Sequence, residues 1–454
     1  MKFILTLWLC KLIAALIGRI APQRGSNYSG GIATRLMPDF VAHFQGIDYG
    51  KVIFITGTNG KSTTTNLVRH TLQSAGKTVA CNAEGANMMG GVATALIKNS
   101  TLGGRLRAEF LVLEIDERSF PHIRKVLPGQ HMGITNLEKD QVQRNGDPDF
   151  IFRKFQGAIG QDMTLYLNNE EPRSKALEHC AGNAVYFSLA KNEKSYTRKG
   201  LYAVTLPCPK CGHPIAYRHY NLASIGPFAC THCGHGSEDT PEVLVTDIDF
   251  AAGTFRCGGA EFSASYRNPF YIYNYAMAIA ICRHFGLEDG QLAHAFSTFV
   301  NPATHVDDYF FHGKEIHYLQ GKQENPEALQ TQLDVIAADK RKKAVFVGLH
   351  EVADFYPYYG GSFYFFDCDF APVVESGVTD YVAFSTTVCY DLAYRMIYAG
   401  APEDRVTVLE TNDLETITGK LDEIEADVAY FLTNTKHCEL LRDYFKQYGG
   451  DANG

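Results

Sequence analysis

KVIFITGTNGKST, residues 51–63, is the stretch that decides the fold of this chain. An apolar run ends at a short glycine loop, and then a lysine and two hydroxyl residues open an amphipathic segment that reaches about Gly76. This order predicts a strand, a phosphate-binding loop and a helix, because glycines let backbone N–H groups surround a phosphate and the start of a helix adds positive potential. The alternative is a helix-opening turn without a ligand, since Ile55 stands where the ordinary P-loop pattern has its first glycine.

The side chains of this loop predict how a nucleoside triphosphate would be held. We expect Lys61 to contact the terminal phosphates and the Ser62 hydroxyl to bind Mg²⁺. The nucleotide-binding residues that the pattern indicates are Gly57, Thr58, Asn59, Gly60, Lys61, Ser62 and Thr63.

Composition places the chain among ordinary globular proteins of more than one domain. Its 454 residues allow two or three domains, and 45% apolar with 20% charged residues permit a large core. The formal net charge of −8 argues against nucleic acid as a partner. Of the 12 cysteines, four fall in a pattern and the others are scattered singly, which fits a reducing cytoplasm and one metal site.

The first 21 residues, Met1–Ala21, are strongly apolar and carry three basic residues, Lys2, Lys11 and Arg19. The segment lacks a small-residue cleavage site of the kind that follows a signal peptide, and a lysine near its middle would be costly in a membrane span. Two interpretations remain for the helix that it predicts. It either packs on the protein or lies at a membrane surface, where residues 1–21 would give the chain a peripheral contact on the inner face of the membrane.

Further strands alternate with helical stretches after the phosphate loop, and each strand is near-continuously apolar, as buried parallel strands are. These strands are expected at residues 78–81, 109–116, 131–136, 164–167 and 184–189. The pattern predicts an α/β fold with a doubly wound parallel sheet.

Changes in composition set the domain boundaries. Residues 201–242, rich in Pro, Gly, His and Cys, indicate an insertion, and Asn301-Pro302 marks a boundary. Beyond it, apolar strands alternate with helices again and predict a smaller, Rossmann-like C-terminal α/β domain. Its strands are expected at residues 344–349, 363–366, 381–384, 406–409 and 428–432. The expected parts are therefore an apolar helix and linker (1–48), a nucleotide-binding domain (49–300) that contains the insertion (201–242), and the C-terminal domain (301–454).

Two CxxC pairs lie in the insertion, Cys208 with Cys211 and Cys230 with Cys233. Each pair can hold one metal ion from a tight turn, and four thiolates complete the tetrahedron of a structural Zn²⁺ site. The alternatives are accidental pairs or disulfides. Three nearby histidines are other potential ligands, although surface positions are the simpler expectation for them; these are His213, His232 and His235.

Polar residues follow several inner strands, at the edge of the sheet where ligands bind in such folds. Glu114 ends one strand and is a candidate Mg²⁺ ligand, whereas Asp116 and Glu117 also fit the start of an ordinary loop. Thr135-Asn136 repeats the pattern weakly. Asn274 is a single amide on an otherwise apolar helix, and such a residue is commonly structural.

Taken together, these stretches resemble the Mur ligase family and, more narrowly, its MurT group, the ligase-like subunits of lipid II isoglutaminyl synthases. The residues that carry the resemblance are Arg24-Gly25-Ser26, the phosphate loop, Gly85-Ala86-Asn87-Met88, Leu113–Glu117, Thr135-Asn136 with Asp140-Gln141, the cysteine insertion and Ile272-Tyr273-Asn274. Most Mur ligases have a metal-binding histidine where this chain and the MurT group have glutamine, at Gln141.

The resemblance implies an ATP-dependent ligase that amidates a peptidoglycan precursor. In the MurT group, ATP phosphorylates the α-carboxylate of the D-glutamate in the lipid II stem peptide, and ammonia from a separate glutaminase, GatD, attacks the acyl phosphate. Lys61 and a Mg²⁺ ion held by Ser62, Glu114 and Gln141 would then neutralise the transferring phosphoryl group. By the same resemblance, Asn274 would lie near the nucleotide base, and Asp354 would orient ammonia or act as a base.

The C-terminal part departs from the family pattern. Where the family carries a Gly-Arg pair, the chain reads Thr304-His305-Val306-Asp307-Asp308, and the family's acidic loop is reduced to Ala353-Asp354. Three alternatives to the amidating ligase therefore remain. They are a divergent paralogue with another substrate, a ligase that joins an amino acid, and a nucleotide-binding scaffold that has lost turnover, in which Asp354 is only a loop carboxylate.

Overall fold

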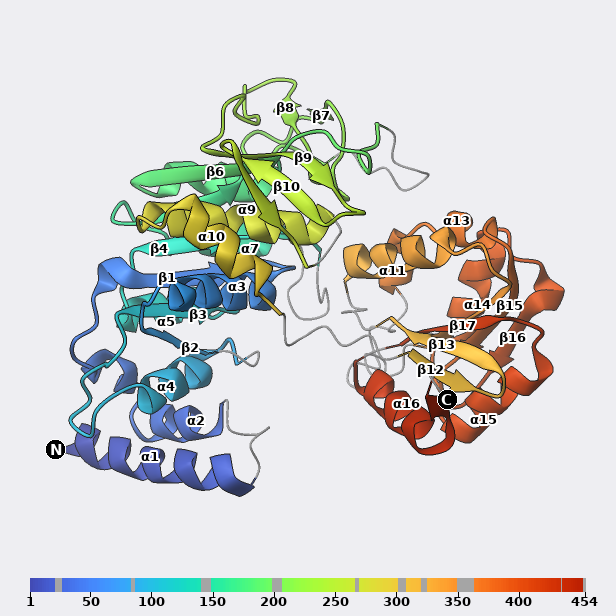
Figure 1. Cartoon of the computed structure of the whole chain (residues 1–454), viewed down its shortest axis with the longest axis horizontal. Coiled ribbons are helices and arrows are strands. Elements are labelled where there is room, and N and C mark those ends of the chain that lie inside the picture. Colours follow the sequence, from blue (N-terminus) through green and yellow to red (C-terminus); the bar gives the residue numbers. More distant parts are fainter. Residues whose placement is uncertain are drawn as a thin grey trace. The chain divides into compact units, whose positions relative to one another are not determined.

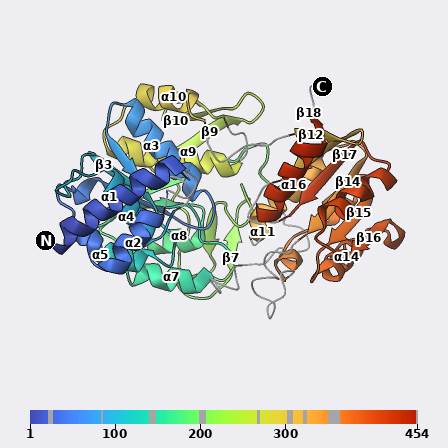
Figure 2. The same cartoon turned by 90° about the horizontal axis from the view of Figure 1, so that it is seen from below.

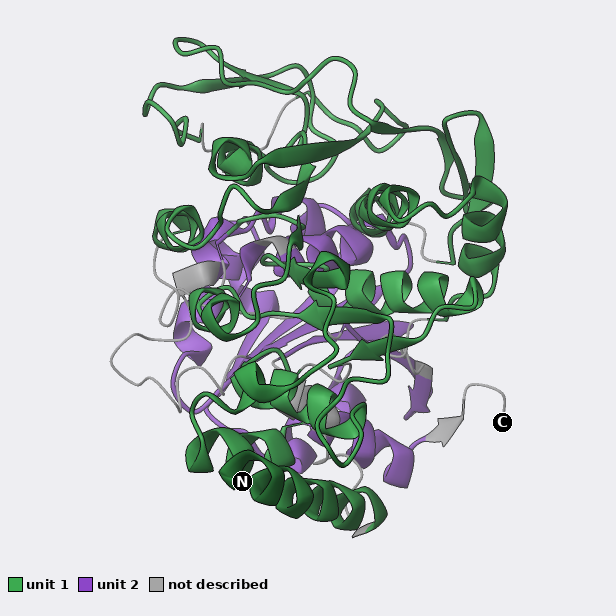
Figure 3. Ribbon diagram, turned by 90° about the vertical axis from the view of Figure 1, so that its left-hand side faces the viewer, with its two compact units in different colours: residues 1–138, 147–198, 205–303 green, residues 139–146, 199–204, 304–454 purple. Residues whose placement is uncertain are grey.

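The computed structural model describes residues 1–20, 27–82, 86–139, 148–197, 206–265, 269–300, 308–319, 325–348, 363–433 and 435–451. The chain forms two compact units (Figure 3). Unit 1 takes residues 1–138, 147–198 and 205–303, and unit 2 takes residues 139–146, 199–204 and 304–454.

One sheet of nine strands forms the centre of unit 1 within the described residues (Figure 1). Its strands are β1 (Val52–Thr56), β2 (Val79–Cys81), β3 (Phe110–Glu114), β4 (His131–Ile134), β5 (Thr164–Asn168), β6 (Asn183–Leu189), β9 (Val243–Asp249), β10 (Thr254–Cys257) and β11 (Ala260–Ser263). Their order is β11-β10-β9-β6-β5-β4-β1-β3-β2. Neighbours from β9 to β2 are parallel, and β10 is antiparallel to both of its neighbours, β9 and β11.

Helices cover both faces of this sheet because successive residues of a strand point to opposite sides. They are α3 (Lys61–Ser74), α4 (Met89–Lys98), α5 (Phe120–Val126), α7 (Pro148–Gln156), α8 (Pro172–Ala176), α9 (Pro269–His284) and α10 (Asp289–Ser297). In β1, Val52 and Phe54 join the apolar cluster that α4, α5 and α7 close. Ile53 and Ile55 join the cluster that α3, α9 and α10 close. The predicted α/β fold with a parallel sheet is thus confirmed.

Two further helices, α1 (Lys2–Ile20) and α2 (Tyr28–Leu36), lie beside α4 (Figures 1 and 2). One side of α1 packs on the protein, where Leu7 and Cys10 are fully buried and Phe3 contacts the ring of Phe40. The helix is therefore packed on unit 1, as one of the two interpretations has it. Among the described helices, none combines the length and the apolar character needed to cross a membrane.

Between β6 and β9 the chain leaves the sheet and forms an antiparallel hairpin of β7 (Ile215–Tyr217) and β8 (Phe228–Cys230). Parallel strands need a crossover connection, which is commonly a helix. Here the cysteine-bearing segment supplies it, and we call residues 206–242 the ribbon. Residues 201–205 of the expected insertion lie outside the described residues.

Unit 2 contains a seven-stranded sheet in the described part of the chain. Its strands are β12 (Asp308–Phe311), β13 (Lys314–Tyr318), β14 (Lys343–Gly348), β15 (Val378–Phe384), β16 (Val406–Leu409), β17 (Val428–Leu432) and β18 (Gly450–Asp451), in the order β16-β15-β14-β17-β13-β12-β18. The pairs that involve β12 are antiparallel and the others are parallel. The helices are α11 (Pro326–Ala338), α13 (Ala371–Val374), α14 (Cys389–Tyr398), α15 (Leu414–Gly419) and α16 (Thr435–Tyr448).

The strand expected at residues 363–366 is wrong. Phe363–Asp367 forms a 3₁₀ helix, in which Phe365 is buried and its carbonyl accepts from Arg395 Nε at 3.4 Å. The same buried guanidinium donates to the carbonyl of Cys368. Both carbonyls therefore accept hydrogen bonds from Arg395 and not from a neighbouring strand. The sequence reading also missed β9 to β13 and α11, whose residues alternate between burial and exposure or carry polar side chains.

Several expectations concern positions outside the described residues. They are Arg24-Gly25-Ser26, Gly85, Asp140, Gln141, the boundary at Asn301-Pro302, Thr304–Asp307, Ala353 and Asp354.

Candidate functional site

The phosphate loop, residues 57–63, lies at the carboxyl end of β1, where α3 begins. Gly60 precedes the helix with a φ of +87°, a left-handed conformation that glycine adopts without strain. Thr64 N donates to Gly60 O, so the N–H groups before it have no acceptor inside the helix. This end of α3 therefore offers donors and positive potential to an anion.

Lys61 folds back over the loop and pairs with a carboxylate. Its Nζ donates to the carbonyl of Gly57, to Thr58 O at 3.2 Å and to Glu117 Oε1 at 2.6 Å. Burial raises the pKa of the Glu117 carboxyl, and the adjacent ammonium group opposes that rise. Glu117, for which the sequence left open a role at the sheet edge or the start of an ordinary loop, is thus the counter-ion of the lysine.

The loop after β4 holds the phosphate loop from its other side. Asn136 accepts from Thr58 N at 2.8 Å through its carbonyl and from Asn59 N at 3.0 Å through Oδ1. A Cβ at Gly57 would meet Thr135 Oγ1 at 2.3 Å, so glycine permits the close packing of the two turns. The weak signal at Thr135-Asn136 therefore marks a support of the phosphate loop.

Glu114 ends β3 beside the phosphate loop. The register of β3 with β1 sets Glu114 opposite Ile55, and Ile115 N donates to Ile55 O at 2.9 Å. The Glu114 side chain is buried, and its Oε1 accepts from Asn87 Nδ2 at 3.2 Å. Asp116 instead closes its own turn by accepting from the backbone N–H groups of residues 118 and 119. Of these two carboxylates, Glu114 is the one held in place at the sheet edge that carries the phosphate loop.

A small pocket opens at the same edge of the sheet. Its lining includes the amides of Asn136, Asn168 and Asn274 and apolar side chains such as Phe187 and Met277. Within the described structure, Asn168 Nδ2 and Asn274 Nδ2 are buried without a hydrogen-bond partner. Because buried donors are normally satisfied, these two amides can each donate to a bound water or to an acceptor of a ligand.

Asn274 also joins the pocket to the phosphate loop. A Cβ at Gly60 would come within 2.4 Å of Asn274 Oδ1, so the amide lies directly against the loop backbone. The amide therefore contacts the loop, and Asn274 is also one of the residues that line the pocket. The loop and the pocket share a wall.

A buried carboxylate ties the pocket to the ribbon. Glu170 Oε2 accepts from Tyr273 OH at 2.6 Å and from Leu189 N at 3.0 Å, and its Oε1 accepts from Asn221 Nδ2 at 3.1 Å. Burial raises the pKa of Glu170 to about 7. Tyr273 lines the pocket, and so does Leu222, the neighbour of Asn221. The Glu170 network thus fixes two walls of the pocket, one from α9 and one from the ribbon.

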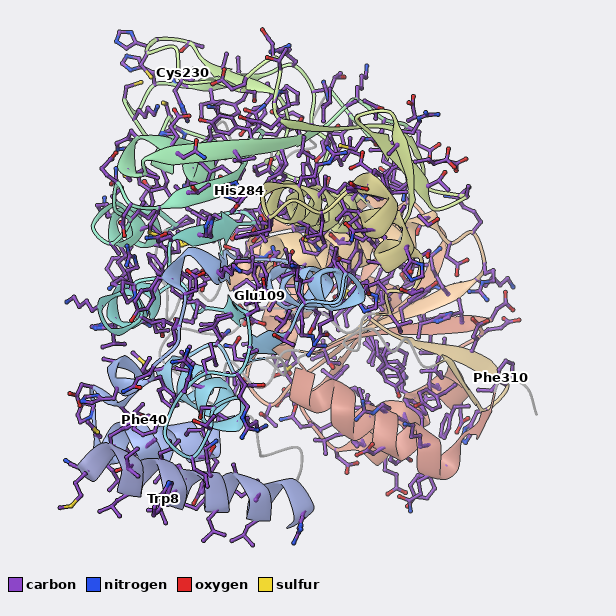
Figure 4. All side chains as sticks on the ribbon, turned by 60° about the vertical axis from the view of Figure 1, so that its left-hand side comes forward. Trp8, Phe40, Glu109, Cys230, His284 and Phe310 are labelled. Atoms are coloured by element: carbon purple, nitrogen blue, oxygen red, sulfur yellow. The ribbon has the colours of Figure 1, made fainter. Side chains whose placement is uncertain are left out.

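Four cysteine sulfurs gather in the ribbon, where Figure 4 labels Cys230. The thiols of Cys208, Cys211, Cys230 and Cys233 all lie within 4.8 Å of one another. Cys208 and Cys233 are 3.6 Å apart, and Cys211 and Cys230 are 3.5 Å apart, which is too far for a disulfide. A tetrahedron with metal–sulfur bonds of about 2.3 Å has edges of roughly 3.8 Å, so the four sulfurs can reach one ion.

The three histidines near the cysteines do not share one environment. His213 and His232 are exposed and stack on each other, with ring centroids 4.0 Å apart. His235 is buried, and its Nε2 lies 2.9 Å from Pro172 O. The expectation of a surface position is therefore wrong for His235, because this ring links the ribbon to α8.

The structure brings together the phosphate loop, Glu114 and Asn274 at one edge of the sheet in unit 1. Ser62 and Thr63 lie in the first turn of α3, and the four cysteines lie apart from this site, in the ribbon. Sequence reasoning missed Asn168 and Glu170, and it named Glu117 without its role as the partner of Lys61. The usable signal for Asn168 and Glu170 was the polar run that follows a buried strand, the same pattern that singled out Glu114.

Two family models match the chain. The Mur ligase middle domain matches residues 55–205, and the MurT ligase C-terminal model matches residues 323–436. The chain thus carries a region similar to the Mur ligase middle domain and a region similar to the C-terminal domain of MurT ligases. The first match covers the phosphate loop and Glu114, and the second covers most of unit 2.

MurT subunits are among the relatives of the chain. The MurT subunit of lipid II isoglutaminyl synthase (glutamine-hydrolyzing) from Staphylococcus aureus strain COL is 26% identical over 344 residues, 75% of this chain and 76% of the relative. The corresponding subunit from Streptococcus pneumoniae is 25% identical over 418 residues, 90% of each chain. The resemblance to MurT seen in the sequence is thus confirmed.

Solved structures of Mur ligases share the fold. A pseudomurein peptide ligase type C from Methanothermus fervidus superposes with a TM-score of 0.65 at 15% identity, over 90% of this chain and 81% of that chain. MurF from Acinetobacter baumannii gives a TM-score of 0.62 at 12% identity, over 92% and 80%. At these identities the likeness concerns the fold alone.

Proposed function

We propose that this protein amidates the α-carboxylate of the D-glutamate in a lipid II-type peptidoglycan precursor at the expense of ATP. The observation that carries the proposal is the wall shared by the phosphate loop and the amide-bearing pocket, a layout that suits a triphosphate joined to a flat base. The MurT relatives are subunits of a glutamine-hydrolyzing lipid II isoglutaminyl synthase, which favours ammonia as the nucleophile.

The nucleotide would lie across this shared wall. In the proposal, the phosphates sit on the N–H groups that open α3 and on the ammonium group of Lys61. The base occupies the pocket, where Asn168 Nδ2 and Asn274 Nδ2 supply donors for its ring nitrogens and Phe187 and Met277 supply apolar contact. This arrangement would satisfy both unpartnered amides.

The proposed reaction has two transfers. A carboxylate oxygen of the substrate attacks the γ-phosphorus, and ADP leaves with the electrons of the broken P–O bond. Ammonia then attacks the acyl carbon, phosphate leaves, and a base takes the proton that the nitrogen loses. Lys61 would stabilise the transferring phosphoryl group. Asp354, outside the described residues, is proposed to orient ammonia or to act as that base.

Two metal ions fit the donors that the chain offers. The Ser62 hydroxyl and the Glu114 carboxylate are hard oxygen ligands of the kind that Mg²⁺ takes, and the Gln141 amide is proposed as a third. Mg²⁺ would supply charge neutralisation for the phosphates. The four sulfurs of the ribbon fit Zn²⁺ in a closed site without room for substrate, so we assign that ion a structural role.

The ammonia source in this proposal is a GatD-like glutaminase that works as a separate subunit in the cytoplasm, where ATP and the cytoplasmic face of the lipid-linked precursor are available. A ligase of this kind would bind no nucleic acid. Its partner would hydrolyse glutamine and deliver ammonia without release to the solvent.

The decisive experiment supplies the purified chain with ATP, Mg²⁺, lipid II and ammonium, and measures ADP and amidated lipid II by mass spectrometry. We expect product with ammonium alone, and product from glutamine only when a glutaminase subunit is added. Lys61→Ala serves as the negative control. Product that requires a free amino acid would identify an amino-acid ligase instead. ATP binding without any turnover would identify a scaffold, and either result would refute the proposal.

A further inference from the structure

The outer side of α1 is apolar, whereas its only internal cation points inward. Lys11 Nζ donates to the carbonyl of Ile97 and to Ser100 O at 2.8 Å, at the carboxyl end of α4. A lysine there satisfies carbonyls that the helix leaves open and complements the negative end of its dipole. The usual order of a surface helix is therefore reversed, with the charge against the protein and the leucines outside.

The exposed residues of α1 form one continuous stripe. Leu5, Leu9, Leu12 and Leu16 recur every three or four residues, and they and Trp8 are each between 46% and 59% exposed. Figure 4 shows Trp8 on the outer side of the helix and Phe40 on its inner side. Leu102, also exposed, extends the stripe, because Trp8 Nε1 donates to Leu102 O at 3.0 Å. Contiguous apolar surface of this kind marks an interaction site.

Most of the charged residues near the stripe are basic, although the exposed Asp39 lies next to Phe40, which contacts Phe3 of α1. Residues 1–20, 27–36 and 86–107, which form α1, α2, α4 and the loop after α4, contain no aspartate or glutamate. Exposed basic residues frame the stripe instead, in a chain whose formal net charge is −8. They are Lys2 and Arg19 at the ends of α1, Arg35 on α2, Lys98 on α4, and Arg105 and Arg107. A mainly basic rim around a leucine stripe is complementary to an anionic surface with an apolar interior.

We propose that the outer face of α1 lies in the plane of an anionic lipid bilayer, with the leucine stripe among the acyl chains and the basic rim at the headgroups. Trp8 would lie at the boundary between the acyl chains and the headgroups. This position suits an indole, which is apolar with one polar N–H. The protein covers one side of the helix and lipid covers the other. This surface is independent of the ligase reaction, and its test needs no turnover.

The test uses Trp8 as the probe, because it is the only tryptophan of the chain. Purified protein is mixed with vesicles of phosphatidylglycerol and phosphatidylcholine, and flotation and Trp8 emission are recorded. We expect a shift of the emission to shorter wavelength, quenching by brominated acyl chains, and weaker binding to pure phosphatidylcholine and at high salt. Absence of binding to the anionic vesicles would overturn the proposal.

Matched variants locate the contact. Leu5→Glu/Leu12→Glu should weaken the partition into anionic vesicles by roughly tenfold or more, since burial of even one leucine contributes that factor. Leu244→Glu, at an exposed leucine of β9 in the same unit, should leave the partition unchanged. Thermal unfolding checks that both variants fold. If the double variant does not fold, the salt dependence and the quenching measured on the native chain still test the proposal. If the native chain is a dimer without lipid and the double variant is a monomer, the stripe binds a second copy of the chain. That result would overturn the proposal.

Discussion

Lys61 Nζ lies 2.6 Å from Glu117 Oε1, and the two side chains are only 6% and 7% exposed. Charges so poorly solvated interact more strongly than a surface pair, and loss of either partner leaves the other buried without compensation. In the proposed complex, a nucleotide phosphate has to compete with Glu117 for the ammonium group. The Lys61–Glu117 pair therefore couples the stability of unit 1 to the affinity of the phosphate loop for a nucleotide.

Lys61→Ala is expected to weaken ATP binding by roughly ten- to a hundredfold, because a hydrogen bond to a charged group contributes about 1.5–3 kcal/mol. It should also lower the free energy of unfolding, since Glu117 stays buried without its cation. Titration calorimetry measures the first effect and chemical denaturation the second. The double variant Lys61→Ala/Glu117→Gln should regain stability but not affinity. Equal instability of the single and double variants would contradict the counter-ion role.

Gly60→Ala should disrupt the wall between loop and pocket. A Cβ at residue 60 would come within 2.4 Å of Asn274 Oδ1 and force that amide out of place. Gly76→Ala is the matched control, because Gly76 has a φ of +79° against +87° for Gly60 but nothing within 4 Å of its added Cβ. Both variants bear a similar backbone strain, so only Gly60→Ala should lose ATP affinity as measured by calorimetry. Equal losses of ATP affinity in the two variants would show that backbone strain, and not the contact with Asn274, causes the loss.

Loss of the Zn²⁺ that we propose for the ribbon should weaken nucleotide binding at a distance. Leu222 and Ile225 of the ribbon line the pocket, and Asn221 holds Glu170. Cys230→Ser should lower the zinc content, speed hydrogen exchange across residues 206–242 and raise the Kd for ATP. Cys180→Ser, at a cysteine outside the cluster, should change none of the three. Loss of zinc with unchanged exchange and Kd would refute the coupling.

Glu170 predicts a pH dependence of stability. Its pKa in the folded protein is about 7 against an ordinary value of 4.5, so the folded state binds this proton more tightly than the unfolded state. Glu170 should therefore lower the free energy of unfolding as the pH rises from about 4.5 to about 7, by roughly 3 kcal/mol, with no further change above that range.

The comparison that isolates this effect uses Glu170→Gln, whose side chain does not titrate. Denaturation at a series of pH values gives the difference in unfolding free energy between the native protein and the variant. That difference should change between pH 4.5 and pH 7 and stay level outside this window. A constant difference throughout would mean that Glu170 titrates normally.

The phosphate loop could be predicted from the sequence because its geometry is local. The glycines, the lysine and the hydroxyl residue that form this loop must follow one another in the chain. The unbroken apolar run before them predicts the position of β1. Glu114 was found for a related reason, since any polar residue that ends a buried parallel strand lies at the ligand-binding edge of the sheet.

The partners of these residues could not be predicted because strand order decides them. Glu117 reaches Lys61 only because β3 lies beside β1, and Asn168 reaches the pocket only because β5 follows β4 in the sheet. The aromatic run at Phe363–Phe366 misled the prediction of a strand. Its conformation depends on Arg395, which is far away in sequence and whose burial no local pattern reveals.

The pairing of β12 with β18 joins two segments that are about 140 residues apart in the sequence (Figure 2). During synthesis on a ribosome, Phe310 and its neighbours emerge long before Gly450, so one edge of β12 has to wait unpaired while the intervening chain is translated. Pairings of such large sequence separation also form slowly. The sheet of unit 2 therefore stays incomplete until Gly450 has been translated, and the unpaired edge of β12 exposes the nascent chain to aggregation until then.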